Sequence, residues 1–344
     1  MTSRVTITDV ARAAGVSVAT VSKVVNGRDG IARGTAALVQ QVVADLGYES
    51  SIVARSLRSH RTHVLGILVA EFEPFSTEIL KGAGAALAGT PYDLLAYTGA
   101  AGAPGAAGRA GWEQRYLSRL SGTLIDGAVL VTPTVVAVAA GVPVVAVDPH
   151  AGPGGLPTVD SDNQHGALLA TRHLLGLGHR RIGFLGGRAD LESSRLREAG
   201  YRQALAEAGL AVDPCLLHVA EYRRDAAAAP TATMLGLDDP PTAVFAANDL
   251  SAMGILDAAQ RLGLRVPDDL SVVGFDDIPE SASTTPGLTT VRQEIQQMGA
   301  AAVDLLVGLV EGAPAASAHT RLPTALVLRG STAAPALRPG RAPR

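Results

Sequence analysis

Residues 9–26 of the chain read Asp9-Val-Ala-Arg-Ala-Ala-Gly-Val-Ser-Val-Ala-Thr-Val-Ser-Lys-Val-Val-Asn26. Apolar side chains recur at helical spacing where this stretch begins, at Ile7, Val10, Ala11 and Ala14. They predict a short helix that starts near Thr8 and ends at Gly15. Ser17 is placed to cap a second helix that ends near Val25. Two short helices that are joined by a glycine turn are typical of a helix-turn-helix.

A third helix is predicted directly after this motif. Leu38, Val42 and Leu46 repeat every four residues, and Gly47 follows as a helix-ending residue. Three short helices with few aromatic side chains bury little apolar area, so we expect this head to be of low stability on its own. The predicted head is all α-helical and spans residues 1–49.

The exposed face of the second helix is built from small or polar side chains: Ser17, Val18, Ala19, Ser22, Lys23 and Asn26. A helix that enters a major groove needs such a face, because acidic side chains would repel phosphate and bulky ones would block the approach. We expect Val18 and Ala19 to contact thymine methyl groups and Lys23 to reach guanine acceptors. Thr20 or Ser22 is placed to hold phosphate. An ordinary solvated helix is the alternative interpretation.

Charge is distributed unevenly along the chain. The formal net charge is −3, but residues 1–62 carry eight Lys or Arg residues against four acidic ones. This segment is therefore +4, which leaves −7 for the rest of the chain. A small basic head on an acidic body is the charge pattern expected when only the head meets a polyanion.

The composition excludes several classes of protein. Apolar residues make up 47% of the 344 residues and charged residues 18%, which is typical of a folded chain long enough for more than one core. The single cysteine, Cys215, has no partner for an internal disulfide, and we interpret it as a packing residue. The sequence begins without a secretory signal, and no apolar run has the length needed to cross a bilayer. We therefore expect a cytoplasmic protein.

From His63 onward, short apolar runs alternate with helical stretches. The runs that read as buried parallel strands are 64–69, 127–131, 142–147, 181–185, 243–246 and 270–274. The helical stretches include 79–88, 112–120, 166–177, 197–208 and 250–262. This alternation predicts an α/β fold with sheets that are covered by helices on both faces. The strands are too many for one sheet, so we expect two lobes, with crossovers at 153–157 and 284–288.

Residues 9–26 resemble the N-terminal signature of the lac-repressor (LacI/GalR) family of transcriptional regulators. The family's spacing continues in Leu46-Gly-Tyr48 and in Ala54-Arg-Ser-Leu-Arg58. The resemblance implies a hinge helix or linker at 50–61 that folds on DNA, with Leu57 wedged into the minor groove at the operator centre. It completes the expected DNA-binding set with Thr8, Tyr48, Ala54, Arg55, Leu57 and Arg58.

Motifs of the same family recur through the body as far as about Thr332. They include Ile125-Asp-Gly127, Val159-Asp-Ser-Asp-Asn163, Gly178-His-Arg-Arg-Ile-Gly-Phe184, Ala246-Ala-Asn-Asp249, Val273-Gly-Phe-Asp-Asp277 and Leu288-Thr-Thr-Val-Arg-Gln293. The resemblance implies a two-lobed, type I periplasmic-binding-protein-like body with two doubly wound parallel sheets, over residues 62–334. The N-lobe is expected at about 62–158 and 290–322, the C-lobe at about 159–289 and 323–334, and a disordered tail at 335–344.

An effector is expected in the cleft between the lobes, at the carboxyl ends of the strands. Asp148, Asn248 and Asp276 each follow an apolar run that reads as a strand, and carboxylates and amides suit the many hydroxyl groups of a sugar. The resemblance completes the expected effector-binding set with Phe75, Ser193, Arg197, Tyr222 and Gln293. Capping of the next turn is the alternative for Asp148, and core packing is the alternative for Phe75.

The sequence carries no Gly-x-Ser-x-Gly elbow, no Walker loop and no His-Glu-x-x-His motif. We therefore predict a protein that is not an enzyme and that needs no cofactor or metal. The predicted function is a repressor of carbohydrate-utilisation genes, which binds a palindromic operator in double-stranded DNA as a homodimer and responds allosterically to a mono- or oligosaccharide. The alternatives are a solute-binding protein with the same body fold, an architectural DNA binder without an effector, and a regulator with a non-sugar effector such as a purine.

Overall fold

The computed structural model of the chain describes residues 5–25, 27–48, 61–99, 111–135, 141–314 and 319–336. The chain divides into two compact units, one formed by residues 1–62 with 122–125 and the other by the rest of the body. Among the described residues, no helix combines the length and the apolar character that crossing a membrane requires.

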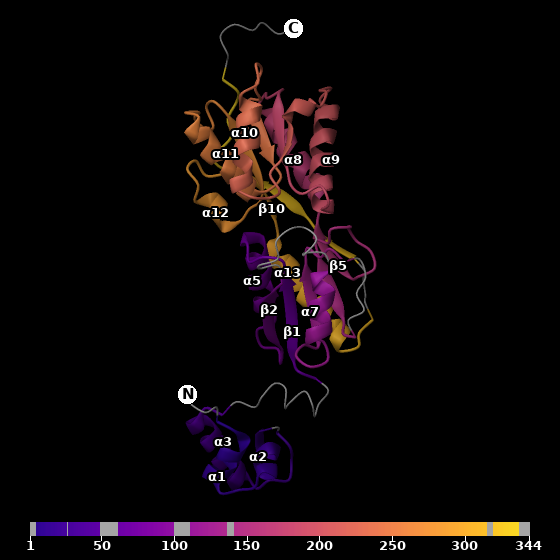
Figure 1. Cartoon of the computed structure of the whole chain (residues 1–344), viewed down its shortest axis with the longest axis vertical. Helices are drawn as coiled ribbons and strands as arrows, with labels where there is room; N and C mark the ends of the chain where they lie inside the picture. The colour runs from indigo at the N-terminus through magenta and orange to yellow at the C-terminus, as the bar shows by residue number, and fades with distance from the viewer. Residues whose placement is uncertain are drawn as a thin grey trace. The chain divides into compact units, whose positions relative to one another are not determined.

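The head consists of the helices α1 (Ile7–Ala14), α2 (Val18–Val25) and α3 (Arg33–Leu46) (Figure 1). A capping box begins α1, because Thr6 and Asp9 each accept the main-chain N–H of the other. Gly15 ends α1 with a φ of 65°, a left-handed conformation that glycine adopts without a steric penalty. Ser17 caps α2, since its hydroxyl accepts the N–H of Thr20 at 3.1 Å.

The core of the head is small and takes side chains from all three helices. Val10, Val21 and Val39, one from each helix, are fully buried at its centre. Smaller side chains of α1, Ala11 and Ala14, complete the contact with the neighbouring helices. The helix-turn-helix predicted from residues 9–26 is confirmed.

Lobe 1 of the body contains a six-stranded parallel sheet in the order β11-β5-β4-β3-β1-β2. Its strands are β1 (Val64–Val69), β2 (Asp93–Thr98), β3 (Gly127–Val131), β4 (Val144–Val147), β5 (Thr158–Ser161) and β11 (His319–Leu322). Its helices are α5 (Pro74–Ala86), α7 (Trp112–Leu120) and α13 (Ile295–Val310) (Figure 1). The strands β1, β3 and β4 are buried at every residue, which explains why each reads as a continuous apolar run.

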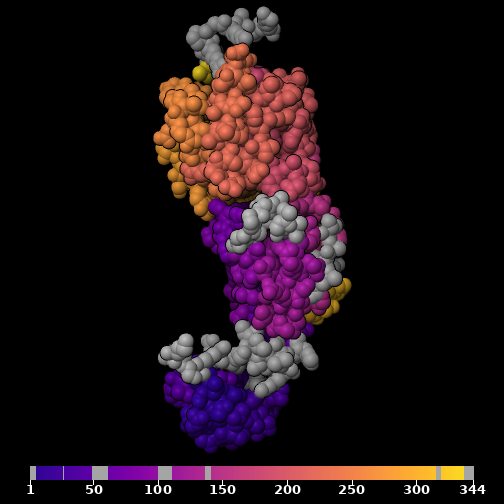
Figure 2. Space-filling model, viewed as in Figure 1, coloured from indigo at the N-terminus to yellow at the C-terminus, as the bar shows by residue number. Residues whose placement is uncertain are grey.

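Lobe 2 contains a second six-stranded sheet, in the order β12-β10-β9-β8-β6-β7, in which only β12 runs antiparallel to its neighbour. Its strands are β6 (Ile182–Gly186), β7 (Leu217–Val219), β8 (Ala243–Ala246), β9 (Ser271–Asp276), β10 (Thr289–Gln293) and β12 (Thr324–Val327). Its helices are α8 (Asn163–Gly176), α9 (Glu192–Glu207), α10 (Ala228–Leu235), α11 (Asp249–Arg261) and α12 (Pro279–Ala282). Figure 2 shows one face of this lobe in space-filling form. Two wound sheets confirm the predicted fold class.

The first crossover between the lobes lies at Asp162, and the prediction that placed it at 153–157 was wrong. The strand β5 pairs with β4 and β11, so residues 158–161 belong to lobe 1 and not to the second lobe. Residues 153–157 are a turn that leads back to the sheet of lobe 1. Its last residue, Pro157, accepts the N–H of Ala146 in β4 at 2.8 Å.

The second crossover lies at Glu294, and the prediction that placed it at 284–288 was also wrong. The strand β10 pairs with β9 and β12, so residues 290–293 belong to lobe 2. The loop 284–288 stays within lobe 2, because the N–H of Leu288 donates to the main-chain oxygen of Ser281 at 2.9 Å. A third crossover lies at Pro323, between β11 of lobe 1 and β12 of lobe 2, where the predicted boundary had placed it.

Candidate functional site

Arg197 is the centre of a buried polar cluster in the body. It lies in the second turn of α9 and is only 4% exposed. Its Nε donates to Oδ1 of Asn163 at 2.8 Å, and its Nη1 donates to the main-chain oxygen of Ala247 at 2.5 Å and to Oδ1 of Asp276 at 3.3 Å. The guanidinium also lies over the ring of Phe275, 3.8 Å from its centroid. These contacts fix the plane of the guanidinium before any ligand is bound.

Asp276 lies at the carboxyl end of β9 and accepts a hydrogen bond from Nε2 of Gln293 at 2.6 Å. Its main chain has a φ of 113°, which a non-glycine residue adopts only when its surroundings hold it there. Burial, with a smaller contribution from the carboxyls of Glu73 and Asp148, outweighs the lowering effects of Arg197 and Gln293 and raises the pKa of Asp276 to about 7. This carboxyl therefore changes its charge near neutral pH.

A substitution of Asp276 with asparagine is expected to flatten the pH dependence of stability between about pH 4 and pH 7. In this window the folded state keeps the proton of Asp276, whereas the unfolded chain releases it near the ordinary pKa of 3.8. The folded state then binds more protons, so the free energy of unfolding contributed by this group falls as the pH rises, by about 1.4 kcal/mol per pH unit.

Urea unfolding of the wild type and of Asp276→Asn at several pH values measures this difference. Asp304→Asn, at an exposed position of α13, is the control and is expected to keep the slope of the wild type. Equal slopes for the wild type and Asp276→Asn would show that the carboxyl is already ionised at low pH.

Asp148 brings a second carboxyl from lobe 1 to the cluster. It follows β4 directly and has a φ of 46°. Burial raises its pKa, while Arg197 and hydrogen bonds from Ser193 and Asn163 act in the opposite direction. Because Ser193, Asn163 and Arg197 all belong to lobe 2, Asp148 faces the other lobe.

Tyr222 covers the cluster with its ring, whose centroid is 5.6 Å from the Cζ of Arg197. Gly187 provides the space for this ring, because a Cβ at residue 187 would overlap it. Asn248 holds the main chain of Tyr222: its Nδ2 donates to the Tyr222 oxygen at 3.1 Å, while its Oδ1 caps α11 by accepting the N–H of Ser251. Among the described residues, the buried hydroxyl of Tyr222 forms no hydrogen bond of ordinary geometry, although Ser193 lies close enough to lower its pKa.

The structure thus brings seven of the eight expected effector-binding residues into one network: Asp148, Ser193, Arg197, Tyr222, Asn248, Asp276 and Gln293. Phe75 is half-buried in the first turn of α5 and packs against the core of lobe 1, which was the alternative for it. It is linked to the cluster through Glu73, which accepts its N–H at 2.8 Å and acts electrostatically on Asp276.

Sequence reasoning missed three participants in the cluster. Asn163 orients Arg197, Phe275 stacks beneath it, and Glu73 caps α5 while burial raises the pKa of its carboxyl. Asn163 and Phe275 both lie within motifs that the sequence displays, the first two residues after β5 and the second inside β9. Their position at strand ends was the available signal.

The expected DNA-binding residues of the head fall into three groups. Thr8, Ser17, Val18, Ala19 and Lys23 are exposed, and Thr20 and Ser22 are half-buried. Tyr48 is half-buried and packs against the head core, so its contact with its own domain is structural. The predictions for Asn26, Ala54, Arg55, Leu57 and Arg58 lie outside the described residues.

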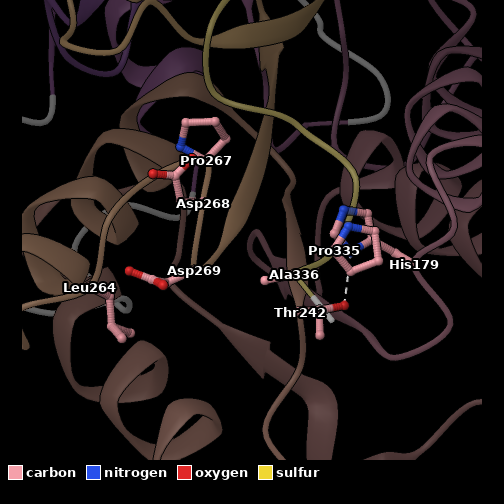
Figure 3. A pocket seen from close by; sticks show the side chains of 8 residues that line it. All are labelled: His179, Thr242, Leu264, Pro267, Asp268, Asp269, Pro335 and Ala336. Atoms are coloured by element: carbon pink, nitrogen blue, oxygen red, sulfur yellow. Dashed lines mark hydrogen bonds between the residues drawn. The ribbon is translucent and has the colours of Figure 1, made fainter. Parts of the chain in front are cut away.

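A pocket in lobe 2 lies away from this cluster, at the amino ends of β8 and β9 (Figure 3). Its lining residues are His179, Thr242, Leu264, Pro267, Asp268, Asp269, Pro335 and Ala336. Nδ1 of His179 is hydrogen-bonded to the hydroxyl of Thr242 at 2.8 Å, and its Nε2 lies within 2.9 Å of the main-chain oxygen of Ala333. Nε2 therefore holds the C-terminal segment, and Nδ1 holds the residue before β8.

Two family models match the chain. Residues 6–51 match the model described as bacterial regulatory proteins of the lacI family, and residues 171–332 match the periplasmic binding protein-like domain. The HTH-type transcriptional repressor PurR of Photobacterium profundum is 32% identical over 316 residues, which cover 89% of this chain and 92% of the relative. The chain belongs to the lacI family.

Solved structures of this family match nearly the whole length of the chain. A complex of the transcriptional regulator CelR with cellobiose is 31% identical, has a TM-score of 0.69 and covers 95% of this chain and all of its own. A lac repressor dimer bound to operator and the anti-inducer ONPF is 28% identical, has a TM-score of 0.82 and covers 96% of this chain and all of its own. This lacI-family chain is therefore a DNA-binding transcriptional regulator with an effector-binding body, as predicted, and not an enzyme.

Proposed function

We propose that this regulator represses carbohydrate-utilisation genes by binding a palindromic operator as a homodimer, and that a mono- or oligosaccharide controls this binding. The observation that supports the proposal most is the cluster around Arg197. It gathers carboxyl, amide, hydroxyl and guanidinium groups at the carboxyl ends of strands of both lobes. The unpartnered hydroxyl of Tyr222 is a polar group that a bound ligand would satisfy.

The charge of the cluster favours an uncharged effector. Asp148, Asp276 and Glu73 supply three carboxyls whose pKa values are raised by burial, against a single guanidinium. An anionic ligand would add to this repulsion, whereas sugar hydroxyl groups donate to carboxylates and accept from Arg197. A structural relative, CelR, is known in complex with cellobiose. A purine is the second class of effector that we include in the test.

In the proposed mechanism, the head of residues 1–49 reads the operator with α2, and residues 50–61 form a hinge that carries Leu57 into the minor groove. Ligand binding at residues of both lobes changes the angle between them, and the hinge passes this change to the head. The shift in operator binding equals the difference in ligand affinity between the two states of the body. As a chromosome-binding regulator, the protein would act in the cytoplasm.

The experiment that tests the proposal begins with the purified full-length chain and a random pool of duplex DNA. Sequences that survive several rounds of binding are expected to contain a palindrome. The complex with that sequence is then titrated with glucose, cellobiose, ribose, galactose and hypoxanthine. A change in operator affinity with a sugar supports the proposal, and a response to hypoxanthine alone overturns its sugar effector. If no palindrome is enriched, the proposed binding to a palindromic operator is wrong.

Substitution of Asp148 with asparagine is expected to weaken binding of the active sugar at least about tenfold. Asparagine replaces a carboxyl oxygen with an uncharged amide group, which is a weaker acceptor. A hydrogen bond from a sugar hydroxyl to a charged acceptor contributes about 1.5–3 kcal/mol. Isothermal titration calorimetry of the free protein measures the affinity, and operator binding without sugar is expected to be unchanged. Asp93→Asn, at an exposed position of β2, is the control. Unchanged sugar affinity in Asp148→Asn would remove this residue from the effector site.

Substitution of Lys23 with alanine is expected to weaken operator binding by about 1–3 kcal/mol if its ammonium reads guanine. The affinity for unrelated DNA should change much less, because binding without sequence preference comes from phosphate contacts. Fluorescence anisotropy with both duplexes at several salt concentrations separates the two contributions. Arg12→Ala is the matched control, since Arg12 is exposed on α1 and paired with Asp9. An equal loss on both duplexes would assign Lys23 to phosphate.

A further inference from the structure

A second group of contacts joins the lobes two residues beyond Asp148. The main-chain oxygen of His150, in the loop after β4, accepts the N–H of Glu192 at 2.9 Å and Nη2 of Arg195 at 3.2 Å. Nδ1 of the same histidine lies 3.3 Å from Oδ2 of Asp190. The acceptor belongs to lobe 1, whereas the other three residues lie in the loop before α9 and in its first turn.

These contacts reinforce one another within lobe 2. Nη2 of Arg195 also binds Oε2 of Glu192 at 2.7 Å, and its Nη1 donates to the main-chain oxygen of Ala189 at 3.0 Å. Asp190 is bound in turn by Nη2 of Arg188 at 2.6 Å. The guanidinium of Arg195 therefore ties the loop before α9 to the start of the helix and presents both to His150.

The lobes make a different kind of contact elsewhere. Leu250, Met253 and Ile278 come from α11 and the loop after β9 in lobe 2, yet they pack into the apolar core cluster of lobe 1. To separate the lobes here, this buried apolar surface would have to be exposed to water, which costs about 25 cal/mol of free energy per Å². The contacts at His150 are polar, and the Arg195 and Asp190 side chains are 48% and 54% exposed. The bonds that cross the boundary go to the main-chain oxygen of His150, and single hydrogen bonds contribute only about 0.5–1.5 kcal/mol each. This is therefore the side on which the lobes can separate.

We propose that His150, Asp190, Glu192 and Arg195 form a latch between the lobes, and that Arg195 and His150 are positioning residues for the effector site. Glu192 and Arg195 lie in the same turn of α9 as Ser193, and His150 lies two residues after Asp148. When the latch is closed, Asp148 faces Ser193 and Arg197. When it opens, the two halves of the cluster separate, because each is attached to one side of the latch. The link to an effector rests on the proposed function, but the latch itself concerns the lobes alone.

The distance between the lobes tests the proposal without any ligand. Spin labels at Ser118→Cys in α7 and Ala206→Cys in α9, in a Cys215→Ser background, report one distance across the lobes by double electron–electron resonance. Labelled protein is diluted with unlabelled protein, so that distances between chains do not contribute. In Arg195→Ala the ratio of long to short distances is expected to rise at least threefold, and Asp190→Ala is expected to shift it in the same direction.

Arg202→Ala is the matched control. Arg202 lies on the same helix, is 46% exposed and forms an ion pair with Glu198 that is as short as that of Arg195 with Glu192, but it makes no contact with lobe 1 among the described residues. Its loss removes an ion pair from the same helix and should leave the distance distribution unchanged. Identical distributions in the wild type and both latch variants would overturn the proposal.

The same experiment keeps the latch separate from the proposed function. If no sugar in the panel changes operator affinity but Arg195→Ala separates the lobes, the latch stands and the sugar effector fails. If a sugar acts on the wild type and the distances do not respond to Arg195→Ala, the proposed function stands and the latch fails.

Discussion

Replacement of Arg197 with methionine is expected to lower the free energy of unfolding by about 3–5 kcal/mol at pH 8. Methionine keeps most of the side-chain volume, so the loss measures charge and hydrogen bonds more than packing. The substitution removes three hydrogen bonds at once: the Asn163 and Ala247 oxygens lose the donor Arg197, and Asp276 keeps only that of Gln293. It also removes the only guanidinium that this cluster sets against the buried carboxyls of Asp148 and Asp276.

The loss should depend on pH in a direction that identifies its cause. Arg197 lowers the pKa values of Asp148 and Asp276, so both values rise further when it is removed. A protonated carboxyl needs no cation, and the expected loss is therefore smaller at pH 5 than at pH 8. Urea unfolding at the two pH values measures it, with Arg202→Met as the exposed control from the same helix. A loss below about 1 kcal/mol at pH 8 would show that the cluster does not depend on this charge.

The central strands were predictable because burial on both faces makes them apolar at every position. The runs 64–69 and 127–131 coincide with β1 and β3, and 243–246 coincides with β8. The strand β2 was missed because it lies at the edge of its sheet and none of its residues is fully buried. A strand of this kind mixes Asp93 and Thr98 with leucines, and no period separates it from a loop.

The starts of two body helices were predicted several residues late, and in one of them a side-chain cap, rather than an apolar pattern, decides the start. The body helix predicted from residue 79 begins at Pro74, because the carboxylate of Glu73 accepts the N–H groups of Phe75 and Ser76. The helix predicted from residue 197 begins at Glu192. The late start of the second helix left Glu192 and Arg195 outside any predicted element, so the latch could not be predicted from the sequence.

Part of the candidate effector site was also predictable, and part was not. The chain positions of Asp148, Asn248 and Asp276 follow from strand ends, and the carboxyl ends of parallel strands meet at one edge of a sheet. Their partners do not follow, because Asn163 becomes a neighbour of Arg197 only when α8 and α9 pack against each other. The first two crossovers were predicted wrongly for a similar reason. Whether β5 pairs with β4 or with β6 is decided by contacts between residues that are far apart in the sequence.

Replacement of Gly82 with alanine is expected to destabilise lobe 1 by about 3 kcal/mol or more, although alanine is the better helix former. A Cβ at residue 82 of α5 would overlap the main-chain oxygen of Gln296 in α13, and Gly299 of α13 meets the oxygen of Ile79 in the same way. The two glycines therefore let the helices approach until their backbones touch. An added methyl group has to push the helices apart, which opens the core around Met298.

Gly84 is the matched control because it lies one residue beyond Ala83 on the same helix and faces open space. Gly84→Ala is expected to raise the free energy of unfolding by about 0.5–1 kcal/mol, since the unfolded chain loses conformational freedom and nothing is displaced. Urea unfolding followed by tryptophan fluorescence reports on lobe 1 directly, because Trp112 is the chain's one tryptophan and lies in α7. If both variants were stabilised, the close approach of α5 and α13 would be wrong. Helix propensity acts equally on both positions. A decrease in the free energy of unfolding for Gly82→Ala and an increase for Gly84→Ala would therefore locate the close approach at Gly82.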